Sequence, residues 1–272
     1  MKEKSGNDRD KNTLLSMADN PNFIPGIYNY CDRWCERCPF TLRCMVYAME
    51  KEAFPDQKSR DINNKEFWQK IQQSLVLSNE LLRDMAKARG IDLPSVLPEE
   101  MARKRRMHRK EAEQTPIARQ ARLYSIGTGE WFERHEQLFK MTEEILTKEA
   151  RLGIKEPELT TVNILEAVEV IRWYQDQIWV KLMRALHGED QEEELDDDEL
   201  QDFPKDSDGS AKVALIGIDR SIGAWTQLSE NLEDQSGSIL DILANLGVLR
   251  MKVEERFPRA RSFVRPGFDQ EI

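Results

Sequence analysis

Four cysteines lie within fourteen consecutive residues, and the chain has no others. They are Cys31, Cys35, Cys38 and Cys44, in the spacing Cys-x3-Cys-x2-Cys-x5-Cys. Chance would not gather every cysteine of a 272-residue chain into one segment, so we expect the four to act together. In a reducing compartment, clustered thiols indicate metal or redox chemistry before they indicate disulfides.

The spacing favours an iron–sulfur cluster over zinc. A four-thiolate zinc site usually has two Cys-x2-Cys hooks separated by a longer loop, whereas this segment has one hook. A [4Fe–4S] cube has four iron corners that one winding segment can reach, and proline after a ligand cysteine, as at Pro39, occurs in ferredoxin-type runs. The sequence therefore predicts a [4Fe–4S] cluster, with Zn²⁺ as the alternative cofactor and a thiol redox switch as a third interpretation. The expected ligands are Cys31, Cys35, Cys38 and Cys44.

Two local resemblances bear on this segment. The run Cys35-x2-Cys38-Pro39-x4-Cys44 resembles the end of the iron–sulfur loop of helix-hairpin-helix DNA glycosylases, in which an earlier cysteine supplies the fourth ligand. The resemblance implies a cluster and not glycosylase activity, because that family's longer first gap, hairpin and catalytic segment are missing. The first three cysteines also match the spacing of radical S-adenosylmethionine enzymes, but Cys44 is placed to occupy the iron that those enzymes leave open. Their β/α barrel also needs strands, and this sequence shows no strand pattern.

Beyond the cysteines, apolar residues recur at helical spacing. We expect helices over 64–89 and 161–186, with Gly188 as a stop, and a helix that opens at Thr115-Pro116 and breaks near Gly127-Thr-Gly129. The sequence therefore predicts an all-α protein, a multi-helix bundle preceded by a small cysteine-rich metal-binding loop module. The clearest apolar stripe comprises Ile164, Val168, Ile171, Ile178, Leu182 and Leu186.

The expected domain organisation has four parts. Residues 1–20 form a flexible leader, 21–55 a four-cysteine metal-cluster module, 60–256 the helical bundle and 257–272 a tail. Residues 189–209 are almost wholly acidic and carry few apolar side chains, which predicts a disordered linker inside the bundle.

Charge and hydropathy restrict location and partners. The net charge of −10 gives no overall attraction to nucleic acid or to anionic membranes. No apolar run approaches the roughly 18 residues of a membrane helix, and residues 1–11 lack the apolar core of a signal peptide. We therefore expect a cytoplasmic protein that works with a protein partner, and its apolar helix faces permit a homodimer.

Two weaker signals remain. One basic patch offers phosphate contacts, although the negative net charge argues against nucleic-acid binding and favours a solvated helix face. His135 falls between Trp131 and Leu138 at helical spacing, and a hydrogen-bonded core histidine is favoured over a second site. The patch comprises Arg103, Lys104, Arg105, Arg106, Arg109 and Lys110.

Three functional interpretations follow. The first is a binding or structural protein whose cluster is a staple, redox sensor or electron relay supporting a partner. The second is an enzyme that uses the cluster to relay electrons, and the third is a nucleic-acid-associated iron–sulfur protein. No nucleophile–histidine–acid arrangement can be assigned among three histidines, so the sequence favours the first interpretation and leaves catalytic residues unassigned.

Overall fold

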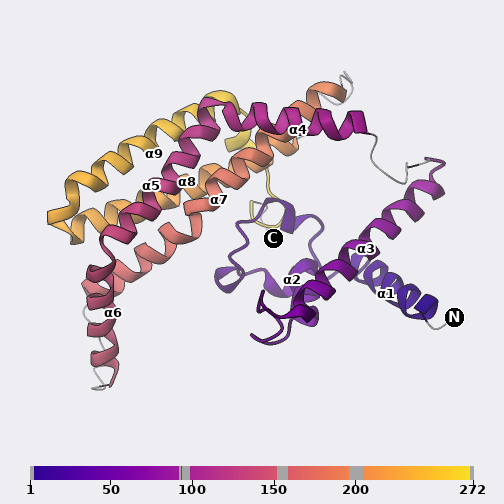
Figure 1. Ribbon diagram of the computed structural model, residues 1–272, viewed down its shortest axis with the longest axis horizontal. Helices are drawn as coiled ribbons and strands as arrows, with labels where there is room; N and C mark the ends of the chain where they lie inside the picture. The colour runs from indigo at the N-terminus through magenta and orange to yellow at the C-terminus, as the bar shows by residue number, and fades with distance from the viewer. Residues whose placement is uncertain (1–2, 92, 94–98, 152–158, 196–204, 270–272) are drawn as a thin grey trace. The chain divides into compact units, whose positions relative to one another are not determined.

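The computed structural model describes residues 3–91, 93, 99–151, 159–195 and 205–269 (Figure 1). Within these ranges every regular element is helical and none is a strand, which confirms the all-α prediction. The chain divides into a first unit, Met1–Ala102 with Arg265–Ile272, and a second unit, Arg103–Val264. This division differs from the expected boundary near residues 55–60. Over the same described ranges, no helix has the length and apolar character that crossing a membrane requires.

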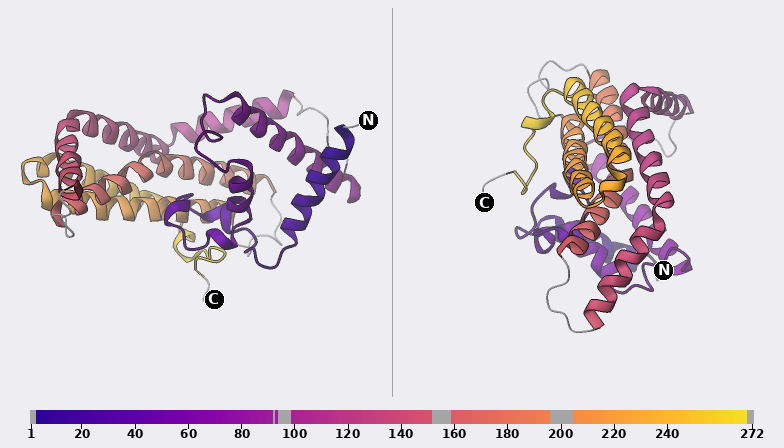
Figure 2. Two further views of the ribbon diagram at one scale, coloured as in Figure 1. Left: turned by 90° about the horizontal axis from the view of Figure 1, so that it is seen from below. Right: turned by 90° about the vertical axis from the view of Figure 1, so that its left-hand side faces the viewer.

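The second unit is built around a four-helix bundle (Figure 1, Figure 2). Its helices are α5 (Pro116–Arg134), α7 (Leu159–Leu195), α8 (Asp206–Asn231) and α9 (Ser236–Arg256). Helix α7 packs on α8, α8 packs on α9, and α5 packs on both α7 and α9, so the four helices enclose one core. Helix α6 (Glu136–Arg151) follows α5 and also contacts α7.

The predicted apolar stripe of α7 forms one wall of this core. All six of its side chains are buried, as the periodicity indicated. Trp131 of α5 and Trp225 of α8 pack edge to face, with ring centroids 4.9 Å apart. Helices α7 and α8 approach closely at Gly217, where an added Cβ would lie 2.9 Å from Cδ1 of Tyr174.

Two expected helix boundaries are wrong, and the ends of the expected linker are helical. Helix α5 runs without a break through Gly127-Thr-Gly129 and ends only at Arg134. Helix α7 does not stop at Gly188 but continues to Leu195, and a Cβ at Gly188 would meet the Ser207 backbone nitrogen at 3.4 Å. Such a Cβ would make an ordinary van der Waals contact, and Gly188 is an interior residue of α7 rather than its end. The expected disordered linker 189–209 is helical up to Leu195 and again from Asp206, and its centre lies outside the described residues.

The first unit contains α1 (Glu3–Ala18), α2 (Met45–Ala53), α3 (Lys65–Ala88) and several 3₁₀ turns. The expected flexible leader is wrong, because most of it forms α1. Nζ of Lys11 pairs with Glu80 Oε2 at 3.1 Å and with Asp84 Oδ2 at 2.9 Å, which holds α1 against α3. Helix α4 (Glu99–Gln114) crosses from the first unit into the second.

The first unit buries few apolar side chains. Among the described residues, Ile27 and Trp34 are its only fully buried apolar side chains. Helix α3 has the expected helical spacing, yet Leu75 and Leu82 are 61% and 59% exposed. The first unit therefore has little hydrophobic core of its own.

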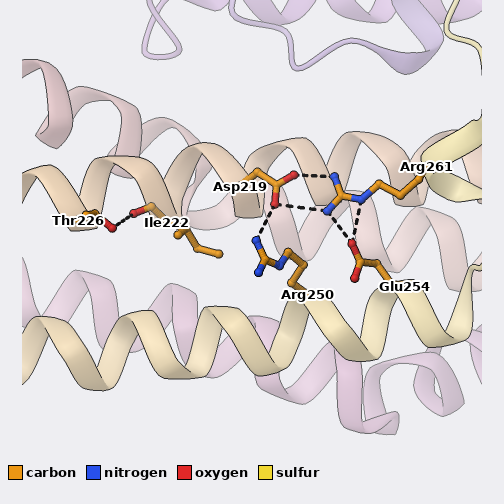
Figure 3. A network of polar contacts seen from close by, with 6 residues as sticks. All are labelled: Asp219, Ile222, Thr226, Arg250, Glu254 and Arg261. Atoms are coloured by element: carbon orange, nitrogen blue, oxygen red, sulfur yellow. Dashed lines mark hydrogen bonds and ion pairs between the residues drawn. The ribbon is translucent and has the colours of Figure 1, made fainter.

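The described part of the expected tail, residues 257–269, contributes to both units. Phe257, Ala260 and Phe263 are buried in the second unit. Arg261 donates from NH1 to Asp219 Oδ2 of α8 at 2.6 Å and from NH2 to Glu254 Oε1 of α9 at 2.7 Å (Figure 3). The hydrogen bond to Asp219 raises the pKa of the Arg261 guanidinium further. The chain then enters the first unit at Arg265.

Candidate metal centre

The four cysteines lie on a series of tight turns that precede α2. Cys31 follows the 3₁₀ turn Ile27–Tyr30, Cys35 begins the turn Cys35–Arg37 and Cys38 ends it, and Cys44 separates the turn Thr41–Arg43 from α2. Ile24 donates its backbone N–H to the Arg43 carbonyl at 3.0 Å and closes the loop. Short turns of this kind bring residues that are close in sequence to one side of the backbone.

The backbone between Cys31 and Cys35 is locally strained. Arg33 has φ of 58° and is the only non-glycine residue with positive φ in the described part of the chain. A left-handed conformation is costly for a residue with a Cβ and persists only where its surroundings impose it. The turn that brings Cys31 towards Cys35 is therefore held by the rest of the loop.

All four cysteines line one pocket in the first unit. The pocket contains about 320 Å³ of free space, part of it open to solvent, and each cysteine is half-buried and free of disulfide bonds. Trp34, 5% exposed, forms part of the wall, and the guanidinium carbon of Arg37 lies 4.3 Å from its ring centroid. The other lining residues are Ile27, Tyr28, Asp32, Arg33, Thr41, Tyr47 and Phe268.

Backbone groups bind two of the sulfurs. Phe40 donates its N–H to Sγ of Cys38 at 3.4 Å, and the thiol of Cys31 donates to the Tyr28 carbonyl at 3.5 Å. An N–H directed at a sulfur stabilises the thiolate form, which is the form that binds metal. The loop therefore provides Cys38 with a hydrogen bond that a bound metal would leave intact.

Burial governs the protonation of the central pair of thiols. It raises the pKa of Cys35 from 9.0 to about 11, with a smaller contribution from the negative charge of Glu50. Burial likewise raises the pKa of Cys38, against the opposing effect of the Phe40 N–H. In the metal-free chain both side chains are neutral thiols at pH 7, so a metal has to displace their protons.

The predicted metal binding itself stays a prediction. Within the ranges that the structure describes, no group of three or more His, Cys, Asp or Glu side chains has an arrangement that could hold a metal ion. The fold brings the four predicted ligands to a common pocket, but the metal, the redox activity and the identity of the cofactor are untested.

The other predicted residues lie elsewhere in the chain. The six basic residues of α4 are all exposed, and Arg109 pairs with Glu113 at 3.2 Å. His135 ends α5, half-buried, with Nδ1 2.7 Å from the Trp131 carbonyl and Nε2 2.7 Å from Oε1 of Gln235. Its ring stacks on Trp131 of the same helix at 4.2 Å, and Nε2 alone joins the end of α5 to Gln235, the residue before α9. This agrees with the hydrogen-bonded histidine that the sequence favoured.

Sequence reasoning missed Phe268, the lining residue that comes from outside the expected module 21–55. It comes from the expected tail, more than two hundred residues after Cys44 in the chain, and lines the pocket beside the four cysteines. Figure 1 shows the yellow end of the chain beside the violet loop that carries them. The dipeptide Pro266-Gly267 was the available signal, because such a pair marks an ordered turn.

Comparison with known proteins finds no match for this chain among family models, curated proteins or solved structures.

Proposed function

We propose that Cys31, Cys35, Cys38 and Cys44 bind a [4Fe–4S] cluster that staples the first unit and senses or relays electrons for a protein partner. One observation carries the proposal: every cysteine of the chain lines the same pocket. Four cysteine thiolates are the usual ligand set of such a cluster.

The cysteine spacing favours a cluster over a single ion. A four-thiolate zinc site usually has two Cys-x2-Cys hooks separated by a longer loop, whereas this segment has one hook. A [4Fe–4S] cube has four iron corners that one winding segment can reach.

The walls of the pocket suit an iron–sulfur cluster. Ile27 and Trp34 are buried, and Tyr28, Tyr47 and Phe268 add aromatic surface. Apolar walls limit the contact of the half-buried sulfurs with water, and the Phe40 N–H supplies a hydrogen bond to one of them. Solvent exposure and hydrogen bonds to sulfur are the two means by which a protein adjusts the potential of such a cluster.

The weak core of the first unit supports the stapling role. With Ile27 and Trp34 as its only fully buried apolar side chains in the described part of the chain, burial contributes little to its stability. Small units of this kind commonly depend on a metal or on disulfides, because the free energy of metal binding becomes free energy of folding.

Four protein ligands also restrict the chemistry. They complete the coordination of the cluster, so it exchanges single electrons or fixes the fold and leaves no position for substrate. The half-buried cysteines lie near enough to the surface for electron exchange with a partner. This favours a binding, structural or electron-relay protein over an enzyme with its own substrate.

Replacing each cysteine by alanine tests the assignment. We expect each variant, purified without oxygen, to lose most of its iron and its broad visible absorption band, because three thiolates hold the cluster incompletely. Thr41→Ser is the matched control, since Thr41 lines the pocket without a thiol, and it should keep both. Wild-type iron and sulfide content in all four cysteine variants would exclude this site. A content of one zinc and no sulfide in the wild-type protein would overturn the cluster assignment, and the proposed function would become that of a zinc-stapled interaction protein.

A second candidate function is association with nucleic acid through α4. All six of its predicted basic side chains are exposed, and at 3.6 residues per turn five of them fall within about 160° of the helix circumference. If this face binds phosphates, the protein should associate with duplex DNA in a salt-dependent manner. The double variant Arg105→Glu/Arg109→Glu should abolish this association, whereas the control Lys87→Glu on α3 should leave it unchanged. Equal binding by both variants would exclude this face.

A further inference from the structure

The turn Arg265–Asp269 is pressed against the loop that carries the cysteines. Gly267 is buried with φ of +76°, a conformation that favours glycine. A Cβ added there would lie 3.0 Å from Cδ1 of both Ile24 and Ile27. Ile27 is itself a wall of the pocket, so the backbone of the turn lies directly behind that wall.

From this position Phe268 reaches the pocket. Its ring meets the ring of Phe40 edge to face, with centroids 5.1 Å apart and planes at 84°. Phe40 is the residue whose N–H binds Sγ of Cys38. Phe268 therefore lines the pocket of the four cysteines and packs against the residue whose N–H binds one sulfur.

An internal ion pair shapes the turn. NH2 of Arg265 lies 2.9 Å from Oδ1 of Asp269, and the backbone N–H of Arg265 donates to Oδ2 at 3.0 Å. The two side chains are 16% and 22% exposed, so water screens the pair less than it screens a surface pair. The guanidinium carbon lies 4.8 Å from the Phe268 ring centroid and adds a second contact to the ring.

The residues just before the turn are anchored in the second unit. Phe263 is 8% exposed, and its carbonyl accepts a hydrogen bond from Lys212 Nζ at 2.5 Å. The ion pairs of Arg261 with Asp219 and Glu254 add a second attachment (Figure 3). The segment before the turn is therefore anchored within the second unit, and the turn begins four residues after Arg261.

We propose that the Arg265–Asp269 turn is a cover over the cysteine pocket, with Phe268 as the side chain that controls access of small reagents to the four sulfurs. Its protection of an iron–sulfur cluster from oxygen and chelators rests on the proposed function. Its control over access to the thiols holds for the metal-free chain as well.

Thiol labelling tests the cover without a cluster. Because all cysteines of the chain lie in this pocket, maleimide labelling of the metal-free protein reports this site alone. We expect Phe268→Ala to accelerate labelling by about twofold to tenfold, the effect of losing one edge-to-face aromatic pair on the detachment equilibrium. Phe268→Leu, which keeps apolar bulk, should fall between. Val264→Ala is the matched control, because Val264 is 54% exposed and outside the pocket, and it should label like the wild type.

The outcomes separate the cover from the cluster. Suppose that folded Phe268→Ala is labelled faster than the wild type, but that the protein never carries iron. This result would support the cover and overturn the cluster. A folded Phe268→Ala protein could instead show wild-type rates of thiol labelling and of iron loss to a chelator. That result would overturn the cover and leave the cluster assignment unaffected. If circular dichroism shows that Phe268→Ala does not fold, Phe268→Leu and Asp269→Asn decide by the same criterion, and wild-type rates in both overturn the cover.

Discussion

Cys35 holds its proton more firmly than a free thiol, because burial disfavours the charged thiolate. The pocket therefore suppresses the reactivity of its own cysteines until a metal replaces their protons. Cys38 shares this burial but receives the Phe40 N–H, which partly restores its thiolate form. The two cysteines thus differ in this backbone hydrogen bond and in the negative charge of Glu50, which raises the pKa of Cys35.

This difference is measurable in the metal-free protein. Alkylation requires the thiolate, so Cys35 should react slowest at pH 8 and gain about tenfold per pH unit until near its pKa of about 11. Because folding raises this pKa, the unfolded chain releases the Cys35 proton at a lower pH than the folded protein does. The contribution of the protonated thiol to the free energy of unfolding is therefore complete below pH 9 and is lost as the pH rises through about 11. Peptide mass spectrometry after timed labelling gives the rate at each cysteine. A plateau for Cys35 near pH 9 would contradict the effect of burial.

At the scale of single elements, α8 contains two glycines with opposite surroundings. A Cβ at Gly217 would lie 2.9 Å from Cδ1 of Tyr174 and 3.1 Å from Cγ1 of Ile178, whereas a Cβ at Gly223 would meet nothing within 4 Å. The first position sets how closely α7 and α8 pack, and the second leaves helix propensity as the main effect.

We therefore expect opposite changes in the free energy of unfolding. Gly217→Ala should destabilise the second unit by about 1–3 kcal/mol through overpacking. Gly223→Ala, its matched control, should stabilise it by about 0.5–1 kcal/mol. Urea denaturation followed by tryptophan fluorescence compares them, since Trp131 and Trp225 are buried in this bundle. Equal effects would show that α7 and α8 do not meet at Gly217.

The cap of α5 gives a second element-scale prediction. Thr115 Oγ1 accepts the Ala118 N–H at 3.3 Å, so Thr115→Ala should destabilise the second unit by about 1 kcal/mol. Thr226→Ala is the control: this exposed hydroxyl only donates to the Ile222 carbonyl of its own helix at 2.9 Å (Figure 3). Its removal should be neutral or slightly stabilising. Equal destabilisation by both changes in urea denaturation would count against the cap.

Local chemistry explains which elements were predictable. The cap at Thr115, the start of α3 after Asn64 and the buried stripe of α7 each depend on neighbours within a few turns. Gly188 was misinterpreted because tertiary packing can keep a glycine inside a helix, here beside Ser207 of α8, and no local pattern encodes that packing. Likewise, the cysteine spacing predicted a common site, but Phe268 reaches it through a long-range contact that spacing does not show.

At the scale of the whole molecule, the two units differ in what stabilises them. The second unit encloses an extended apolar core, whereas Ile27 and Trp34 are the fully buried apolar side chains of the first unit among the described residues. If a cluster staples the first unit, the stability of that unit alone depends on metal.

Chelation should therefore act on one unit. Limited proteolysis of metal-depleted protein is expected to cleave within residues 1–102 at least about tenfold faster than in the loaded protein, while the bundle of residues 116–256 resists in both. Mass spectrometry of the fragments locates the cuts. Identical cleavage of loaded and depleted protein would show that the metal does not stabilise the first unit.

The most direct measurement is the iron, zinc and acid-labile sulfide content of the wild-type protein purified without oxygen, together with its absorption spectrum. We expect about four iron and four sulfide per chain, with a broad visible band that bleaches on reduction. One zinc per chain without sulfide, or no bound metal, would contradict the assignment of Cys31, Cys35, Cys38 and Cys44 as cluster ligands.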